Sequence, residues 1–182
     1  MLIRTLFEKH TKPGFEIAVD LDYFVFLRIF RTLLIALQRF VDQSLDSTRA
    51  ELSQLLYPCF AHFYLKLIIN DHAEMARKFY NEFEPGFEED SPYREDIKRL
   101  GGIMNREQLE QNDIITTFKV RQFIIRLTRD SFISLKRTFN EKKLQVLTDV
   151  IEDHLLIDQF DGLPRTQQQI DAVAGGLLGI DL

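Results

Sequence analysis

The chain has 182 residues, of which 45% are hydrophobic and 28% charged, and 16 of them are phenylalanine. This balance excludes a disordered chain, and the formal net charge of −5 argues against a protein that coats nucleic acid over its whole surface. The single cysteine allows no internal disulfide and favours a reducing compartment, and the apolar runs are far shorter than the roughly 20 residues of a membrane-spanning helix.

Glycine and proline are scarce, and their positions favour helices. Neither residue occurs at positions 15–57 or 103–161. Tight β-hairpins need glycine-containing turns at short intervals, so these long stretches are typical of helices. We therefore predict an all-α fold of about eight or nine helices, in a single compact domain over residues 1–182.

The first predicted helix covers Asp22–Gln43, where apolar residues recur at helical spacing. A second helix is expected to begin at Thr48, because Thr48 and Glu51 have the spacing of a capping box. Pro58 then interrupts the pattern and predicts either a kink or a new helix with this proline near its first turn.

The next helix is expected to open at Asp71 and Glu74, which form another capping signal, and to run to about Phe83. Residues 84–92 contain two prolines and a glycine and are predicted to form an acidic loop.

Two shorter helices are predicted after this loop. Ser91–Pro92 is read as the cap and first residue of a helix that stops at Gly101–Gly102. Asn105, with Gln108 three residues later, is expected to start another.

The following part of the chain is ambiguous. Phe123–Leu127 suits either a helix or a short strand, because β-branched residues cluster there, and Leu155–Phe160 is similar. A very short β pair between them therefore stays open. Thr128 or Asp130 is expected to cap the next helix, and a further helix is predicted at about 141–154.

The C-terminal part begins with a predicted turn at Asp161–Gly162. Thr166 and Gln169 have the spacing of a third capping box, which opens a last short helix that is expected to end at Gly175–Gly176.

A search for catalytic groups favours a protein that is not an enzyme. Cys59 and His62 are three residues apart on a predicted helix, but the surrounding aromatic residues favour a core position for the thiol. The acidic run 88–90 lacks the spacing of a calcium loop, and Gly101–Gly102 lacks the residues of a phosphate-binding loop. We therefore expect no catalytic residues, no cofactor, no metal site and no small-molecule substrate.

The charges are segregated along the chain. Residues 82–96, the acidic segment, carry a net charge of −6, and residues 119–143, the basic segment, carry +6. Three interpretations stay open: the two segments pair across the fold, they are solvated faces, or each steers a partner of opposite charge. For a partner, the candidate binding residues are Arg126, Arg129, Lys136 and Arg137.

Three segments of the sequence resemble one known family. They are Tyr57–Leu65, Phe123–Arg137 and Ile157–Ala172, and the last, with its Phe-Asp-Gly-Leu-Pro-Arg turn before a glutamine-rich cap, is the most specific. In this order and spacing they resemble the N-terminal region of the WD-repeat TBP-associated factor, a subunit of the transcription factor TFIID and, in some lineages, of the SAGA coactivator. The resemblance extends over about residues 23–179.

The resemblance implies a non-enzymatic, all-α scaffold in a nuclear transcription initiation complex, with histone-fold TBP-associated factors as partners. By its chemistry, Arg165 is expected to hydrogen-bond a carboxylate such as Asp158 or Asp161. The resemblance also implies structural roles for Tyr57, Pro58, Phe60, Asp161, Gly162, Pro164, Arg165, Thr166 and Gln169.

Two parts of the family are not expected in this chain. A WD-repeat propeller would carry Trp-Asp pairs, and the chain has no tryptophan. No LisH dimerisation motif is visible before Asp20, so we expect the domain to be monomeric, with weak self-association left open. The alternative function is a nucleic-acid-binding helical module that uses the basic segment.

Overall fold

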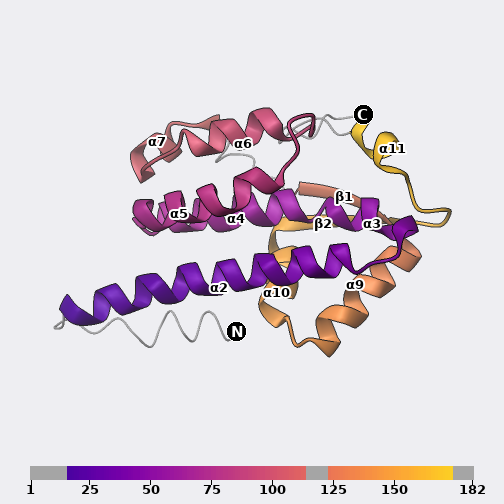
Figure 1. Cartoon of the computed structure of the whole chain (residues 1–182), viewed down its shortest axis with the longest axis horizontal. Helices are drawn as coiled ribbons and strands as arrows, with labels where there is room; N and C mark the ends of the chain where they lie inside the picture. Colours follow the sequence, from indigo (N-terminus) through magenta and orange to yellow (C-terminus); the bar gives the residue numbers. More distant parts are fainter. Residues whose placement is uncertain (1–15, 114–122, 174–182) are drawn as a thin grey trace.

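The computed structural model describes residues 16–113 and 123–173. The fold is all-α apart from one short two-stranded sheet, so the predicted fold class is confirmed (Figure 1). A layer of packed helices forms one part of the molecule, and the sheet with its connecting helices lies beside it (Figure 1).

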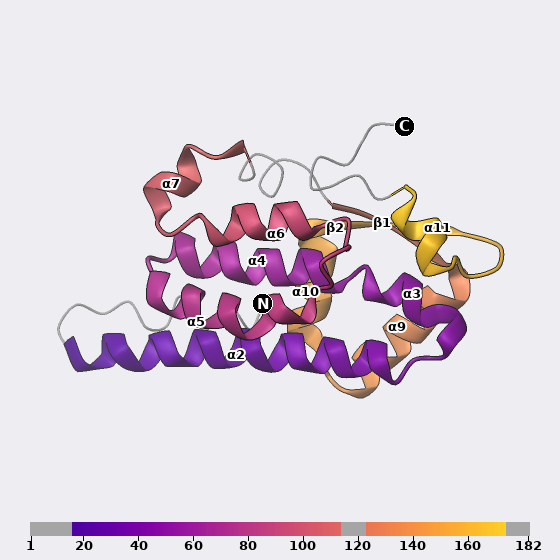
Figure 2. The same ribbon diagram turned by 45° about the horizontal axis from the view of Figure 1, so that its top comes forward.

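The first half of the described chain is helical. Its helices are α2 (Glu16–Asp42), α3 (Asp46–Ser53), α4 (Leu56–Ile69) and α5 (Ala73–Phe83). Helix α2 runs along α4 and α5 (Figures 1 and 2). It buries a stripe at the predicted helical spacing, composed of Phe30, Leu33, Leu34, Leu37, Phe40 and Val41.

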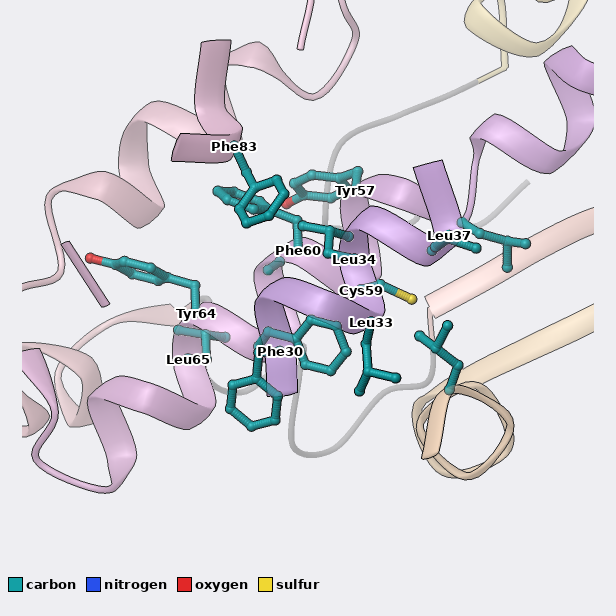
Figure 3. Close-up of a cluster of buried hydrophobic side chains, with 14 of the residues drawn as sticks. Phe30, Leu33, Leu34, Leu37, Tyr57, Cys59, Phe60, Tyr64, Leu65 and Phe83 are labelled. Carbon is teal, nitrogen blue, oxygen red and sulfur yellow. The ribbon is translucent and has the colours of Figure 1, made fainter. Parts of the chain in front are cut away.

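Helix α4 forms the centre of the core. Ten of its 14 residues are buried, as expected of a helix that is apolar on all sides. Its aromatic rings pack against the neighbouring helices: Phe63 stacks on Phe30 with ring centres 4.7 Å apart, and Phe60 on Phe79 at 5.7 Å. Figure 3 shows Tyr57, Cys59 and Phe60 of this helix among the buried side chains of the core. The stretch Asp46–Ile69 has the length and apolar composition of a membrane span, but 72% of its most apolar window is buried inside the fold, which is typical of a core helix.

The segment after α5 covers the far side of α4 (Figure 2). It contains a 3₁₀ turn η1 (Glu84–Gly86) and the helices α6 (Arg94–Gly101) and α7 (Arg106–Glu110). Two buried or half-buried tyrosines hold it in place: the Tyr64 hydroxyl donates to the Ile103 carbonyl at 2.6 Å, and the Tyr80 hydroxyl to the Ile97 carbonyl at 3.0 Å.

The β pair that the sequence left open is present and is parallel. Strand β1 (Phe123–Thr128) pairs with β2 (Leu155–Phe160) residue for residue. Helices α9 (Arg129–Glu141) and α10 (Gln145–His154) connect them, because parallel strands need a long crossover. The last described helix is α11 (Gln167–Asp171), so the predicted helix end at Gly175–Gly176 lies outside the described residues.

Several local predictions are confirmed. The side chains of Asn105, Thr128 and Thr166 each accept a hydrogen bond from the backbone amide three residues further on. Thr166 and Gln169 form a complete capping box. Pro58 lies in the first turn of α4, where its missing amide hydrogen costs no helical hydrogen bond.

Two predicted helix starts are wrong. Thr48 lies inside α3, where its hydroxyl donates to the Leu45 carbonyl at 3.2 Å, and the Glu51 side chain is buried rather than turned back to a cap. Ser91–Pro92 precedes α6 by a turn, in which the Arg94 amide donates to the Ser91 carbonyl at 3.0 Å. In both places a tertiary or turn contact replaces the local cap.

The capping signal at Asp71 and Glu74 is also wrong, because Asp71 closes α4 rather than opening α5. Its φ of 60° is left-handed, and its amide donates to the Ile68 carbonyl at 3.1 Å. The next amide, that of His72, donates to the Leu67 carbonyl at 2.9 Å, which completes a Schellman motif.

Candidate protein-interaction site

The residue that organises this region is Glu51 of α3, whose side chain is fully buried. Its Oε2 atom accepts hydrogen bonds from the Thr128 amide at 2.9 Å, the Thr128 hydroxyl at 2.8 Å and the Ser131 hydroxyl at 2.7 Å. Thr128 ends β1 and caps α9, so the carboxylate ties α3 to the junction between the strand and the helix.

The other carboxylate oxygen holds the turn before α11. Glu51 Oε1 accepts from the Arg165 amide at 3.0 Å and lies 3.9 Å from the Arg165 Nε. The Arg165 guanidinium donates to the Arg126 carbonyl at 2.6 Å. Arg165 thus binds a carboxylate, as expected, but this carboxylate is that of the buried Glu51 rather than Asp158 or Asp161, and the hydrogen bond comes from the Arg165 amide.

The hydrogen bonds determine the charge state of Glu51. Burial raises the pKa of this carboxyl, but the hydrogen bonds from Ser131, Thr128 and Arg165 outweigh it and bring the pKa below its ordinary value. Glu51 is therefore ionised at neutral pH, and it links three segments that are far apart in the sequence.

Cationic and aromatic groups surround this link, and among them Arg126 is exposed while Phe160 and Arg165 are half-buried. The Arg126 Nε lies 3.0 Å from an Asp158 carboxylate oxygen, on the neighbouring strand. The guanidinium carbons of Arg126 and Arg165 lie 5.3 and 5.7 Å from the ring centre of Phe160, within cation–π range. Of the four candidate binding residues, Arg126 is thus the one whose charge is balanced by a neighbour.

The other three candidates lie along one face of α9. Arg129, Ile133, Lys136 and Arg137 share this face by their spacing, and all four are exposed. Lys136 lies 5.0 Å from the ring centre of Phe132. Among the described residues no carboxylate pairs with Arg129, Lys136 or Arg137. The bases of the basic segment that lie outside the described residues are Lys119 and Arg121.

A hollow borders this basic face. It has a volume of about 360 Å³ and lies between α9, α10 and β2. Phe132, Phe139 and Ile151 are among the apolar residues that line it, and Lys136 and Glu152 add one charge of each sign. Apolar contact area and unpaired cations thus occur side by side, as they do in protein interfaces.

The acidic segment does not neutralise the basic segment. Glu82 pairs with Arg31 of α2 at 2.6 Å, and Arg94 pairs with both Glu84 at 2.5 Å and Glu89 at 2.7 Å. No ion pair joins the two segments within residues 16–113 and 123–173, so the interpretation that they pair across the fold is not supported there.

Cys59 is a core residue. It is buried, and burial raises the pKa of its thiol to about 12, whereas a catalytic thiol needs a low pKa. His62 lies against His154 of α10, with ring centres 3.5 Å apart. Within the described part of the chain, no group of three His, Cys, Asp or Glu residues is placed to hold a metal ion.

Comparison with known proteins identifies the family. A family described as "WD40 associated region in TFIID subunit, NTD2 domain" matches residues 28–155. The chain belongs to this family. The match runs from within α2 through α10 and ends at Leu155, the first residue of β2, so the turn that carries Arg165 lies beyond it.

Relatives of this NTD2 chain support the assignment. The "Transcription initiation factor TFIID subunit 5" of Drosophila melanogaster is 32% identical over 143 residues, 79% of this chain and 20% of the relative. The subunit 5 of Caenorhabditis elegans is 30% identical over 168 residues, which are 92% of this chain and 23% of the relative. The "SAGA complex/transcription factor TFIID complex subunit Taf5" of Schizosaccharomyces pombe is 26% identical over 140 residues, which are 75% of this chain and 22% of the relative. The chain thus spans about a fifth of the length of these relatives.

The fold is also that of a solved domain. The structure resembles the crystal structure of the Encephalitozoon cuniculi TAF5 N-terminal domain with a TM-score of 0.66 and 26% identity, over 73% of this chain and 99% of that one. The expected relation to the N-terminal region of the TFIID subunit is confirmed.

The structural motif residues occupy two places in the NTD2 fold. Tyr57, Pro58 and Phe60 are buried in α4. Gly162 has a φ of 155° in the turn after β2, and Thr166 with Gln169 caps α11. The remaining motif residues belong to the same turn, and they are Asp161, Pro164 and Arg165.

Sequence reasoning missed Glu51 as the organising residue. The signal that could have indicated it is its position directly before Leu52 and four residues before Leu55, on the apolar stripe of a helix. A carboxylate there needs buried donors. Nothing in the local sequence indicates that Arg165, 114 residues away, supplies one of them.

Proposed function

We propose that this chain is a non-enzymatic scaffold domain of a TFIID- or SAGA-type transcription initiation complex in the nucleus, and that residues 1–182 act as one domain. The family match and the printed names of the relatives support this proposal. Burial raises the pKa of the Cys59 thiol, which supports a role in which this cysteine is not a nucleophile.

The partners we propose are histone-fold TBP-associated factors, which dock on the basic face of α9. The observation that supports this surface is that Arg129, Lys136 and Arg137 are exposed and lack carboxylate partners in the described residues. Like charges held together on a helix are unfavourable without a partner, so a complementary acidic surface would stabilise them. Arg126 extends this face onto the sheet.

The test is capture of a histone-fold factor pair by the full chain. The variant Arg129→Glu/Lys136→Glu/Arg137→Glu reverses the three unpaired charges. We expect it to lose at least tenfold in affinity, because rim charges of one sign are replaced by repulsion. The matched control, Lys78→Glu/Lys98→Glu/Arg106→Glu, makes the same change of net charge on α5, α6 and α7.

Equal capture by wild type and the α9 variant would contradict the proposed surface. Duplex DNA distinguishes the alternative function: binding at low salt that weakens steeply with salt would support a nucleic-acid-binding module. The same titration without detectable DNA binding would contradict that alternative.

A further inference from the structure

A second hollow lies away from the basic face, where three distant parts of the chain meet. It has a volume of about 280 Å³ and is lined by the junction of α3 and α4, the loop at 86–93 and α11. In Figure 2 the start of α4, the loop before α6 and α11 lie at the same end of the molecule.

The lining of this hollow is acidic. Glu88 and Asp90 come from the loop and Asp171 from α11, and lysine and arginine are absent from the described lining. None of the three carboxylates forms an ion pair in the described part of the chain, although Asp171 accepts a hydrogen bond from Gln167 at 2.7 Å. Three carboxylates thus line one concave surface, and none of them pairs with a cation among the described residues.

Two arginines lie near the hollow, and both are engaged elsewhere. Arg94 pairs with Glu84 and Glu89, and it donates to the Phe87 carbonyl at 3.5 Å. Arg165 is close enough to the Tyr93 phenol to influence its pKa. Its guanidinium, however, donates to the Arg126 carbonyl, and its amide to Glu51. It is therefore held on the other side of the turn and does not line the hollow.

The walls of the hollow are aromatic. Tyr57 stacks on Tyr93 with ring centres 4.4 Å apart and an angle of 7° between the planes, and Phe87 is a third aromatic residue of the lining. Tyr57 is 1% exposed, and its hydroxyl has no hydrogen-bond partner among the described residues. Burial raises the pKa of Tyr93 to about 12, and the Asp171 carboxylate, which lies nearby, contributes. The half-buried Tyr93 ring is thus the aromatic surface that the hollow presents beside the carboxylates.

We propose that this hollow binds an arginine side chain from a basic segment of a partner protein. The guanidinium suits both the acidic lining and the aromatic wall. It is always charged, it donates to several carboxylates together, and it stacks flat on aromatic rings. This surface has the opposite charge to the α9 face, so the inference does not depend on the function proposed for that face.

The size of the hollow favours a side chain over a free small molecule. Its 280 Å³ is below the roughly 300–1,000 Å³ of typical small-ligand pockets. A lysine ammonium would pair with the carboxylates but would not stack over a flat ring pair as a guanidinium does. A site that stacks the guanidinium should therefore bind arginine more tightly than lysine, whereas general attraction between charges would bind both equally.

The experiment uses the full chain and labelled peptides with three spaced arginines, lysines or glutamates, measured by fluorescence anisotropy. We expect the arginine peptide to bind at least fivefold more tightly than the lysine peptide, and the glutamate peptide not to bind. The variant Asp90→Asn/Asp171→Asn should weaken arginine-peptide binding at least tenfold. The control Glu95→Gln/Glu107→Gln removes two exposed charges outside the hollow and should change it less than twofold.

Three results would overturn the proposal: no binding of the arginine peptide at low salt, equal affinity for arginine and lysine peptides, or equal loss in both double variants. Thermal unfolding of each variant identifies any that fails to fold. A further variant, Tyr93→Leu, should then weaken arginine binding more than lysine binding, because it removes the half-buried partner of the ring stack.

Discussion

Glu51 is a buried charge whose partners come from three separate segments. The variant Glu51→Gln keeps the shape of the side chain but places an amide group against at least one hydrogen-bond donor. We expect it to lower the free energy of unfolding by about 2–4 kcal/mol, since hydrogen bonds to a charged group are lost and buried donors stay unpaired. Urea denaturation followed by circular dichroism measures this. Exposed Glu107→Gln is the control, with an expected change below about 0.5 kcal/mol. A similar small change in Glu51→Gln would show that the carboxylate has no anchoring role.

His62 makes the stability depend on pH. Burial lowers its pKa to about 3, with further contributions from His154 and Lys66, whereas the unfolded side chain has its ordinary value near 6.5. Between these values the unfolded chain takes up a proton that the folded chain does not. The free energy of unfolding should therefore fall as the pH drops below about 6.5, by up to about 1 kcal/mol per pH unit.

Glu51 acts in the same direction but at lower pH. Its folded pKa is below the ordinary value of 4.5, so the stability it contributes is present above pH 4.5 and is lost as the pH falls through the folded value. Urea denaturation at a series of pH values separates the two groups. His62→Gln should reduce the slope between pH 6.5 and 5 and leave the loss below 4.5. His72 and His154, whose pKa values burial also lowers, keep part of the slope in this variant. An unchanged slope in this variant would contradict the assignment to His62.

At the level of secondary structure, the end of α9 carries backbone strain. Lys143 has a φ of 52°, and its amide donates to the Asn140 carbonyl at 3.2 Å while the Leu144 amide donates to the Phe139 carbonyl at 2.9 Å, a Schellman motif. A left-handed conformation disfavours residues with a Cβ atom. We expect Lys143→Gly to raise the free energy of unfolding by about 0.5–1 kcal/mol.

The matched control for this substitution is the preceding residue. Lys142 has a φ of −85°, so Lys142→Gly gains no relief of strain and should lower the stability slightly. Chemical denaturation of both variants measures the two changes in the free energy of unfolding. If both glycines change the midpoint in the same direction, the conformation of Lys143 is not strained.

The sequence predicted those elements whose signals are local. Asn105, Thr128 and Thr166 cap helices as expected, because each interacts with an amide three residues away. Thr48 and Glu51 have the same pattern, but Glu51 lies on the buried face of α3 and binds donors 77 to 114 residues away. The parallel pairing of the strands and the acidic hollow likewise depend on long-range contacts, which the local pattern of residues does not contain.

For the whole molecule, the charge segregation of the sequence persists in the fold. The acidic segment is partly neutralised by Arg31 and Arg94, whereas the α9 face keeps its cations unpaired in the described residues. Apart from the buried Glu51, most of the paired charges are exposed, and such pairs contribute about 0–1 kcal/mol each. The surface charges are therefore better suited to recognition than to stability.

Ionic strength separates these two roles. Raising sodium chloride from about 50 to about 500 mM shortens the Debye length severalfold and screens exposed charges, so the free energy of unfolding should change by less than about 1 kcal/mol. Capture of the histone-fold factor pair should weaken at least tenfold over the same range, because it depends on unpaired cations meeting an acidic surface. The α9 charge-reversal variant should show a much shallower salt dependence than wild type. The opposite result is a constant partner affinity together with a falling free energy of unfolding. It would show that the segregated charges stabilise the fold, and it would contradict their role in recognition.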